Sequence, residues 1–369
     1  MKVVVDCRYT RIGFHDGISR YGARVVEALA SLHDVTMLIS DERQLEMLPD
    51  LPWEKVSGPT SAREPFIARQ INRLKPDVVW SPMQTIGSAG RKYALVLTLH
   101  DLIYYENRTP PRDLPQIIRL LWRLYHLSWW PQRWLLNRAD EITTVSATSQ
   151  RLIEKHRLTK RRITVVTNAA DELAPPIERV EPGAVAAESG EPRELVYMGS
   201  FMPYKGVDVL VRSLHHLPGY RLTLLSRISD AERGRLTALA PSPESVVFAN
   251  GASDAEYAAA LDRATAFVHA SRAEGFGIPL VESMSRGTPV VVSDIPIFRE
   301  VGADAALYFA PGSAEQLAAA VRTLEDPAEW TARSAASRER AAHYRWTDAA
   351  DALLEVLERV HAARVARRR

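Results

Sequence analysis

The 369-residue chain contains a single cysteine, Cys7, so no disulfide can form within it. This scarcity of cysteine is typical of a reducing compartment, and we expect a cytoplasmic protein. No apolar run approaches the roughly 18 residues of a spanning helix, and Met1-Lys2 leads into a strand pattern without a signal peptide. The net charge of +2 is too small for a surface that is basic throughout, so nucleic acid is not an expected partner.

The sequence also lacks the G-x-G-x-x-G motif of dinucleotide-binding enzymes. The loop after the first predicted strand holds only Gly13 and Gly17, at a different spacing. That spacing argues against a nicotinamide or flavin oxidoreductase, because the motif brings the backbone close to a pyrophosphate. A single glycine at the start of a helix, as Gly17 is expected to be, still lets one phosphate approach.

Short apolar runs alternate with helical patterns in both halves of the chain, which is typical of parallel sheets covered by helices on both faces. The chain is also longer than one hydrophobic core usually supports. A stretch with four prolines, four glutamates and no apolar periodicity separates the halves. We therefore expect a first domain at 1–172, a linker at 173–193 and a second domain at 194–345. A final helix with a basic end is expected at 346–369.

Helices are expected at 18–32 and 62–74, and a longer one at 114–137 that carries four tryptophans and several arginines. Arginine interleaved with tryptophan is the composition of a helix at a membrane interface. Such a helix can equally pack its tryptophans against a sheet while the arginines reach solvent. We favour the packed helix for 114–137 and keep peripheral membrane contact as the alternative.

The most informative stretch follows an apolar run at 266–270 that is typical of a buried parallel strand. It reads Glu274-Gly275-Phe276-Gly277-Ile278 and continues into a helix that has a proline in its first turn and Glu282 beyond it. Glycines between a strand and a helix let the backbone approach a ligand, and the helix N-terminus favours an anion. Carboxylates accept hydrogen bonds from sugar hydroxyls. The stretch thus suits a nucleotide sugar, although Glu282 could simply complement the helix dipole.

Other candidate residues follow predicted strands, where ligands of parallel sheets bind. Lys205 lies in a strand-to-helix loop beside a glycine and offers a compact positive charge for a diphosphate. His100 follows the 95–100 strand and could contact a sugar hydroxyl. Arg227 follows the 222–225 strand and could reach the nucleotide.

Together these pieces resemble the retaining glycosyltransferases of the GT-B fold, in glycosyltransferase family 4. Within that family the chain looks most like bacterial mannosyltransferases of O-antigen and capsule assembly. The resemblance implies an α/β fold of two Rossmann-like, doubly wound parallel-sheet domains facing across a cleft, with the final helix crossing back to the first domain. It covers nearly the whole chain and rests on five stretches, namely 17–21, 98–102, 205–206, 274–282 and 287–290.

The resemblance also implies roles for residues. Lys205 would bind the donor diphosphate, and Glu274 would hold the donor sugar. Glu282 would take the ribose hydroxyls, and His100 would sit beside the reacting centre. The remaining predicted donor-binding residues are Gly17, Ser200, Arg227, Gly275, Phe276, Gly277 and Ile278.

The sequence departs from the family pattern at three places. Many members carry an arginine where this chain has Ser200 or Tyr204, so part of the positive charge is missing or supplied elsewhere. Ser226-Arg227 replaces a glycine after the next strand, which puts the base preference in doubt. Asn168-Ala169 replaces the usual Asn-Gly.

The predicted function is therefore transfer of a hexose, best mannose from GDP-mannose, to a glycan or lipid-linked acceptor with retention. No aspartate is followed two residues later by another, so the D-x-D metal clamp is absent. We expect no metal and no cofactor. A double displacement needs a carboxylate nucleophile, and the resemblance gives Glu274 another role, so a front-face mechanism is predicted. The alternatives are a nucleotide-sugar epimerase and a catalytically silent binding partner.

Overall fold

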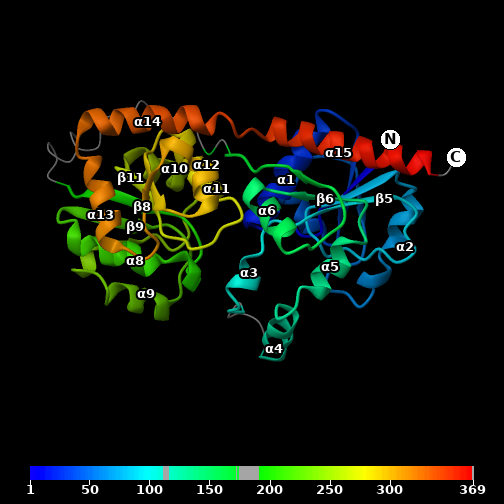
Figure 1. The fold of residues 1–369 in the computed structure, drawn as a ribbon, viewed down its shortest axis with the longest axis horizontal. Helices are drawn as coiled ribbons and strands as arrows, with labels where there is room; N and C mark the ends of the chain where they lie inside the picture. Colours follow the sequence, from blue (N-terminus) through cyan, green and yellow to red (C-terminus); the bar gives the residue numbers. More distant parts are fainter. Residues whose placement is uncertain (111–115, 172, 174–190, 368–369) are drawn as a thin grey trace. The chain divides into compact units, whose positions relative to one another are not determined.

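A computed structural model of the chain describes residues 1–110, 116–171, 173 and 191–367 (Figure 1). These divide into two compact units. Unit 1 contains Met1–Asn168 and Arg345–Arg369, and unit 2 contains Ala169–Tyr344. Most of the expected linker lies outside the described residues. Its last residue, Arg193, already belongs to the first strand of unit 2.

Unit 1 is built on a seven-stranded sheet in the order β3-β2-β1-β4-β5-β6-β7, in which every pairing is parallel. The central strands bury both faces, which explains why they appear in the sequence as continuous apolar runs. The short edge strand β3 was not predicted. The strands are β1 Val3–Asp6, β2 Val35–Ile39, β3 Trp53–Lys55, β4 Val78–Ser81, β5 Ala94–Thr98, β6 Glu141–Thr144 and β7 Ile163–Val165.

The helices of unit 1 follow the expected alternation, with corrections at 62–74 and at 114–137. The region 62–74 was predicted as one helix, and it is instead a broken series of short turns, ending at Lys75 in the left-handed conformation with φ 51°. Pro65 lies in the first turn of this series, where its missing N–H costs no hydrogen bond, and the α-helical part begins only at Ala68. The helices are α1 Gly17–Ala30, α2 Ala68–Ile71, α3 Ile103–Glu106, α4 Gln116–Tyr125, α5 Trp130–Leu136, α6 Ala147–Lys155 and α15 Trp346–Ala366, with 3-10 turns at Glu42–Met47, Glu64–Phe66 and Asn72–Leu74.

The final helix α15 packs on unit 1 rather than on the unit that precedes it in sequence, as Figure 1 shows. At its start, the ring of Trp346 lies 6.3 Å from that of Tyr21 in α1. Near its end, the guanidinium of Arg359 contacts the carboxylate of Glu141 in β6 at 2.5 Å. The predicted return of the C-terminal helix to the first domain is therefore confirmed.

Unit 2 repeats the architecture with six strands in the order β10-β9-β8-β11-β12-β13, again all parallel. Its strands are β8 Arg193–Tyr197, β9 Tyr220–Leu224, β10 Val246–Phe248, β11 Ala266–His269, β12 Val290–Ser293 and β13 Leu307–Phe309. Its helices are α8 Val207–Ser213, α9 Asp230–Thr237, α10 Asp254–Arg263, α11 Ile278–Ser285, α12 Pro296–Gly302, α13 Ala314–Thr323 and α14 Pro327–Ala341, with 3-10 turns at Pro203–Lys205, Leu214–His216, Pro243–Ser245 and Ala303–Ala305. Two Rossmann-like parallel-sheet domains are thus confirmed.

The helix expected at 114–137 is two helices, α4 and α5, and its first two residues lie outside the described ones. The favoured interpretation, a helix packed in the core, is wrong for α4, because none of its residues is buried. Within the described residues no helix is both long and apolar enough to cross a membrane. The apolar surface of α4 therefore needs another explanation, to which we return below.

Candidate active site

The loop that carries Lys205 is held against the sheet of unit 2 by a glycine. Lys205 ends a 3-10 turn after β8, and Gly206 then adopts the left-handed conformation with φ 65° before α8 begins. A Cβ at Gly206 would collide with the carbonyl oxygen of Ala270, which follows β11. Only glycine permits both this conformation and this close approach, so the lysine is fixed beside the carboxyl end of β11.

The structure brings Lys205 and Glu274 together. The Nζ of Lys205 lies 2.5 Å from Oε1 of Glu274, and the two side chains are only 14% and 9% exposed. Burial acts to raise the pKa of Glu274, but the charge of Lys205 and its hydrogen bond outweigh burial, so that pKa is lowered. Glu274 is therefore an ionised carboxylate in a largely dry position, paired with the lysine predicted to hold a phosphate.

His269, the last residue of β11, is a third member of this cluster that the sequence analysis missed. Its Nε2 lies 3.6 Å from Oε1 of Glu274, and its Nδ1 accepts a hydrogen bond from the backbone N–H of Ser271 at 3.2 Å. Burial lowers the pKa of His269 to about 4, so the ring is neutral at pH 7. Because Nδ1 is an acceptor, the proton of the neutral ring resides on Nε2 and faces Glu274.

The glycine turn continues from Glu274 into α11 as predicted. Gly277 is the N-cap of α11 with φ 96°, and a Cβ there would lie 3.1 Å from the ring of Phe298. Among the described residues no side chain caps this helix, and Pro279 stands in its first turn. Pro279 has no N–H and the N–H of Leu280 donates to the carbonyl oxygen of Gly277 at 2.9 Å, so Ile278 is the candidate donor to an anion in this first turn. Glu282 is 2% exposed in the next turn, and the structure leaves its predicted role untested.

Ser200 and Arg227 lie in the loops after β8 and β9. The carbonyl of Ser200 accepts a hydrogen bond from the hydroxyl of Tyr197 at 2.8 Å, while the side chain of Ser200 is exposed. Arg227 is also exposed, and its side chain lies against Gly251. A Cβ added at Gly251 would lie 2.8 Å from the Cγ of Arg227. Both loops follow neighbouring strands, so they share the carboxyl edge of the sheet with Lys205.

In unit 1, Gly17 is the first residue of α1, but a carboxylate already occupies this N-terminus. Asp16 is the N-cap and accepts a hydrogen bond from the backbone N–H of Ser19 at 2.9 Å. The guanidinium of Arg11 contacts Asp16 at 2.7 Å. A Cβ at Gly17 would meet nothing within 4 Å. The residue therefore stands in open space, and no packing requirement explains why it is glycine.

His100 follows β5 by two residues and is held as a neutral imidazole. Its Nε2 lies 2.8 Å from the carbonyl oxygen of Pro82, to which it donates, and its ring meets that of Tyr21 edge to face at 5.0 Å. Burial lowers the pKa of His100 to about 4. With the proton on Nε2, the Nδ1 of His100 can act only as an acceptor for a hydroxyl group.

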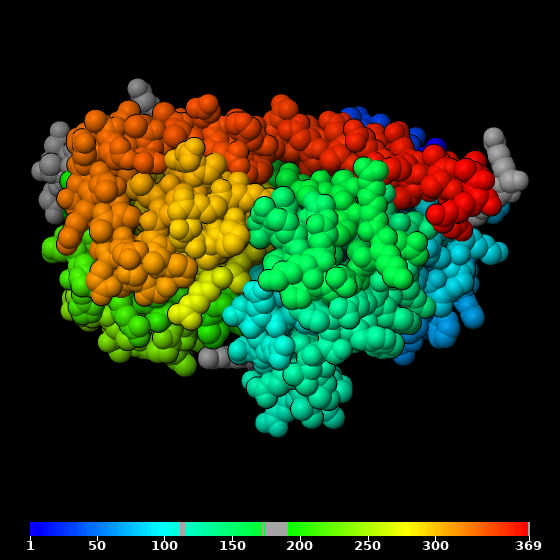
Figure 2. All heavy atoms as spheres, viewed as in Figure 1, coloured from blue at the N-terminus to red at the C-terminus, as the bar shows by residue number. Residues whose placement is uncertain are grey.

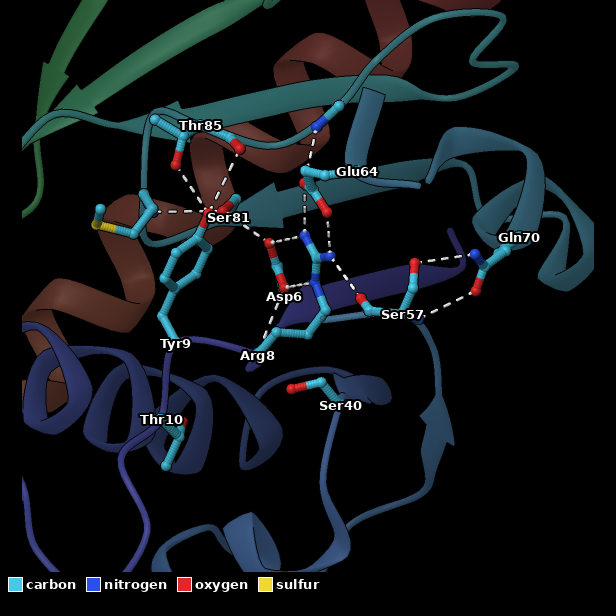
Figure 3. A network of polar contacts seen from close by, with 12 residues as sticks. Asp6, Arg8, Tyr9, Thr10, Ser40, Ser57, Glu64, Gln70, Ser81 and Thr85 are labelled. Atoms are coloured by element: carbon cyan, nitrogen blue, oxygen red, sulfur yellow. Dashed lines mark hydrogen bonds and ion pairs between the residues drawn. The ribbon is translucent and has the colours of Figure 1, made fainter. Parts of the chain in front are cut away.

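A second feature that the sequence analysis missed is the buried charge network at the end of β1, shown in Figure 3. Arg8 donates through Nε and Nη2 to the carboxylate of Asp6 at 2.7 and 3.1 Å. It also donates to Glu64 at 2.6 and 3.1 Å and to the carbonyl of Ser57 at 2.9 Å. All five donors of the guanidinium are thereby used. The network anchors the start of the loop that leads to Gly17.

Neither a metal cluster nor a described cavity coincides with these residues. No group of three or more His, Cys, Asp or Glu side chains within 1–110, 116–171, 173 and 191–367 could hold a metal ion. One cavity of about 300 Å³ lies in unit 1 and another of about 440 Å³ in unit 2, away from the predicted site residues. They are lined by Asp140, Glu141, Arg359, Val360, Ala363, Arg364 and Arg367, and by Arg212, His215, His216, Ala238, Leu239, Ala314 and Glu315, respectively. Neither of these two cavities is lined by a predicted site residue.

Comparison with known families gives a match in each half of the chain. Residues 15–172 match the model described as Glycosyltransferase Family 4. Residues 184–342 match the model described as Glycosyl transferases group 1. The second match contains Lys205, His269, Glu274 and Glu282, whereas the first contains Gly17 and His100.

Individual relatives agree with these matches. The O-antigen chain mannosyltransferase RfbU of Salmonella typhimurium is 24% identical over 328 residues, which are 84% of this chain and 87% of that protein. Glycogen synthase of Mycobacterium tuberculosis is 30% identical over 241 residues, covering 61% of this chain and 55% of that protein. Among solved structures, a sucrose-phosphate synthase from Thermosynechococcus elongatus superposes with a TM-score of 0.75 at 19% identity, covering 98% of this chain and 100% of that one.

Proposed function

We propose that this chain, which belongs to the GT-B glycosyltransferases with a family 4 N-terminal half and a group 1 C-terminal half, transfers a hexose from a nucleotide sugar with retention and without a metal. One observation carries the proposal. Lys205 and Glu274, which lie 69 positions apart in sequence, form an ion pair beside the uncapped N-terminus of α11. That arrangement offers a cation and backbone donors to a diphosphate, and a carboxylate to sugar hydroxyls.

The chemistry follows from the leaving group. When the glycosidic bond breaks, negative charge develops on the nucleoside diphosphate, and donors fixed in advance stabilise it. Lys205 and the N-terminus of α11 would supply that stabilisation, Ser200 and Arg227 would stand along the same sheet edge, and Glu282 would accept from the ribose. Glu274 is paired and ionised, so we assign it to hydroxyl recognition rather than to nucleophilic attack. The departing phosphate would then help to deprotonate the acceptor on the same face.

For the donor we propose GDP-mannose. The support is the likeness to a mannosyltransferase over most of both chains. The likeness to a glycogen synthase covers less of this chain and involves a different sugar, so the base and the hexose need direct measurement. For the acceptor we propose a glycan or a lipid-linked glycan, again by analogy with that mannosyltransferase.

The deciding experiment is a thermal-shift panel of nucleoside diphosphates and nucleotide sugars on the full chain. A ligand that binds only the folded state raises the melting temperature with its concentration. We expect GDP and GDP-mannose to give the largest shifts, and the shifts to survive a chelator. A panel without any shift would remove the nucleotide-sugar assignment.

An activity assay then separates transfer from the two alternatives. Donor consumption that requires an added envelope-glycan extract indicates a transferase. Conversion of the donor without any acceptor indicates an epimerase, and binding without consumption indicates a silent partner. Lys205→Ala and Glu274→Ala are each expected to lower turnover by several orders of magnitude with the fold intact, with Leu32→Ser in unit 1 as an exposed control. Gly17→Ala and His100→Gln test the two predicted residues of unit 1 in the same assay.

A further inference from the structure

Unit 1 exposes eight large apolar side chains on α4, α5 and the turn between them. Figure 2 shows the atoms of this segment, in green-cyan, standing out from the surface. We call this set the α4–α5 surface. Its members are Ile117, Ile118, Leu120, Leu121, Leu124, Leu127, Trp130 and Trp134, which are between 43% and 68% exposed. Single exposed apolar residues are ordinary, but eight within 18 positions mark an interaction site.

The helix α4 has two apolar stripes, of which only one is packed. The ring of Trp122 meets Tyr104 edge to face at 5.2 Å, and the hydroxyl of Tyr125 donates to Gln132 at 3.0 Å. Just after the helix, Trp129 stacks on Tyr105 with ring centroids 3.9 Å apart. These contacts fix the helix on unit 1 along one stripe. The members of the open stripe, at helical spacing on another face, are Ile117, Leu120, Leu121 and Leu124.

The charges beside the open stripe are of one sign. Between residues 116 and 139, all of which the structure describes, the sequence holds four arginines and no acidic residue. At about 100° per residue, Arg123 lies about 60° from Leu120 and flanks the open stripe, whereas Arg119 lies nearer to the packed Trp122. The guanidinium of Arg138 lies 3.9 Å above the ring of Trp134, which keeps a cation beside an exposed tryptophan of α5.

We propose that the α4–α5 surface docks on an anionic lipid bilayer. A short amphipathic helix with aliphatic and tryptophan side chains on one face and arginine at its flank lies in the plane of a membrane interface. Arginines at that depth meet the negatively charged lipid headgroups. The ten residues of α4 are too few to cross the bilayer, so the helix lies on it.

A second copy of the chain is the less suitable occupant. A two-fold contact places the same patch on both partners, so the arginines of one copy would face those of the other with no acidic residue in the patch to pair with them. Anionic headgroups supply that negative charge. An anionic bilayer would thus both bury the apolar side chains and pair with the arginines.

The position of the surface also fits the proposed acceptor. The segment that contains α3 and α4 leaves the sheet after β5, at the carboxyl end of the strands, where ligands of parallel sheets bind. This point rests on the proposed transfer to a lipid-linked glycan. Membrane binding itself does not, because it needs only the exposed side chains and their charges.

The test is co-sedimentation of the full chain with vesicles of neutral phosphatidylcholine, with and without about one third phosphatidylglycerol. We expect binding to the anionic vesicles that weakens with added salt. Leu120→Ser combined with Leu124→Ser should reduce it at least about tenfold. Arg123→Gln should reduce it about fivefold on anionic vesicles and leave neutral vesicles unaffected.

The matched control is Leu32→Ser, which removes a leucine of unit 1 that is 45% exposed outside the surface and should leave binding unchanged. Circular dichroism and the GDP-mannose thermal shift of each variant check that folding and donor binding are intact. A wild-type chain that ignores anionic vesicles, or a double leucine variant that binds them equally well, overturns the proposal. A wild-type dimer that the leucine substitutions dissociate, without vesicle binding, assigns the surface to a second copy and overturns it too.

Discussion

Replacing Lys205 by methionine tests both the geometry and the electrostatics of the candidate site. The substitution keeps the length of the side chain but leaves the carboxylate of Glu274 without the cation at 2.5 Å. Removing one partner of a fully buried pair costs about 3–5 kcal/mol of unfolding free energy. Because these side chains keep 14% and 9% exposure, we expect a value near the lower end, about 3 kcal/mol. For a unit of this size that corresponds to about 6–12 °C in melting temperature.

The loss should depend on pH with a definite sign. In the wild type the pKa of Glu274 is lowered below its usual value of 4.5. The pair therefore contributes stability above pH 4.5 that disappears as the pH falls through the lowered pKa. In Lys205→Met burial dominates and the pKa of Glu274 rises, so the carboxylate costs stability as the pH rises. The difference between wild type and variant should be largest at pH 7 and should shrink below pH 4.5, where His269, with a pKa of about 4, begins to protonate.

The assay is thermal unfolding of the full chain at several pH values, combined with a mutant cycle. Glu274→Gln in the Lys205→Met background removes the unpaired charge and should restore about 2 kcal/mol at pH 7. Turnover should stay low in the double variant, at least about a hundredfold below wild type, because the cation that we propose for the diphosphate is still missing. A change of less than about 2 °C in Lys205→Met, or a change independent of pH, would refute the buried pair.

Three further predictions concern single positions. Gly206→Ala should destabilise unit 2 by more than about 2 kcal/mol, because the new Cβ would need a left-handed backbone and would collide with the carbonyl oxygen of Ala270. Thermal unfolding measures this loss. The control is Gly234→Ala, whose Cβ would meet nothing within 4 Å. Arg8→Lys should lower stability by about 3 kcal/mol, because the three donors of an ammonium cannot replace the five hydrogen bonds of the guanidinium, and urea unfolding measures the loss. The pH–rate profile should show no inflection near 6.5 from His100, whose pKa of about 4 keeps it neutral, and an inflection there that His100→Gln abolishes would contradict the burial.

The strand, turn and helix at 266–285 could be predicted from the sequence because every signal in it is local. The apolar run specifies a buried strand, Gly277 permits the positive φ, and Pro279 fits only the first turn of a helix. The parallel sheets follow from the same kind of evidence, repeated along the chain. Local signals could also have revealed Asp16 as the cap of α1, because aspartate directly before the first residue of a helix is a preferred N-cap.

Contacts between distant positions could not be predicted in this way. The sequence indicates that Arg8 follows a strand, but not that Glu64, 56 positions later, completes its set of acceptors. The pairing of His269 with Glu274 depends on how the turn folds back over the strand end. For α4, both stripes are apolar, so periodicity alone does not tell which stripe packs. The ring contacts of Trp122 and Trp129 in the structure show which stripe packs on unit 1, and the other stripe stays exposed.

In both units a carboxylate lies where the sequence analysis predicts a phosphate: Glu274 beside Lys205 and Asp16 beside Gly17. A diphosphate would meet a different situation at each of them. Under the proposed function, a diphosphate at Lys205 would replace Glu274 as partner of the cation, and the released carboxylate would still have the neutral ring of His269 at 3.6 Å. At Gly17 the carboxylate of Asp16 is bound to the helix itself through Ser19, so a phosphate there would face a like charge that the fold holds in place. Gly17→Ala should therefore raise the KM for the donor only a few-fold, whereas Lys205→Met should lower kcat/KM at least about a hundredfold. Equal effects of the two substitutions on kcat/KM would mean that Asp16 leaves its cap when the donor binds.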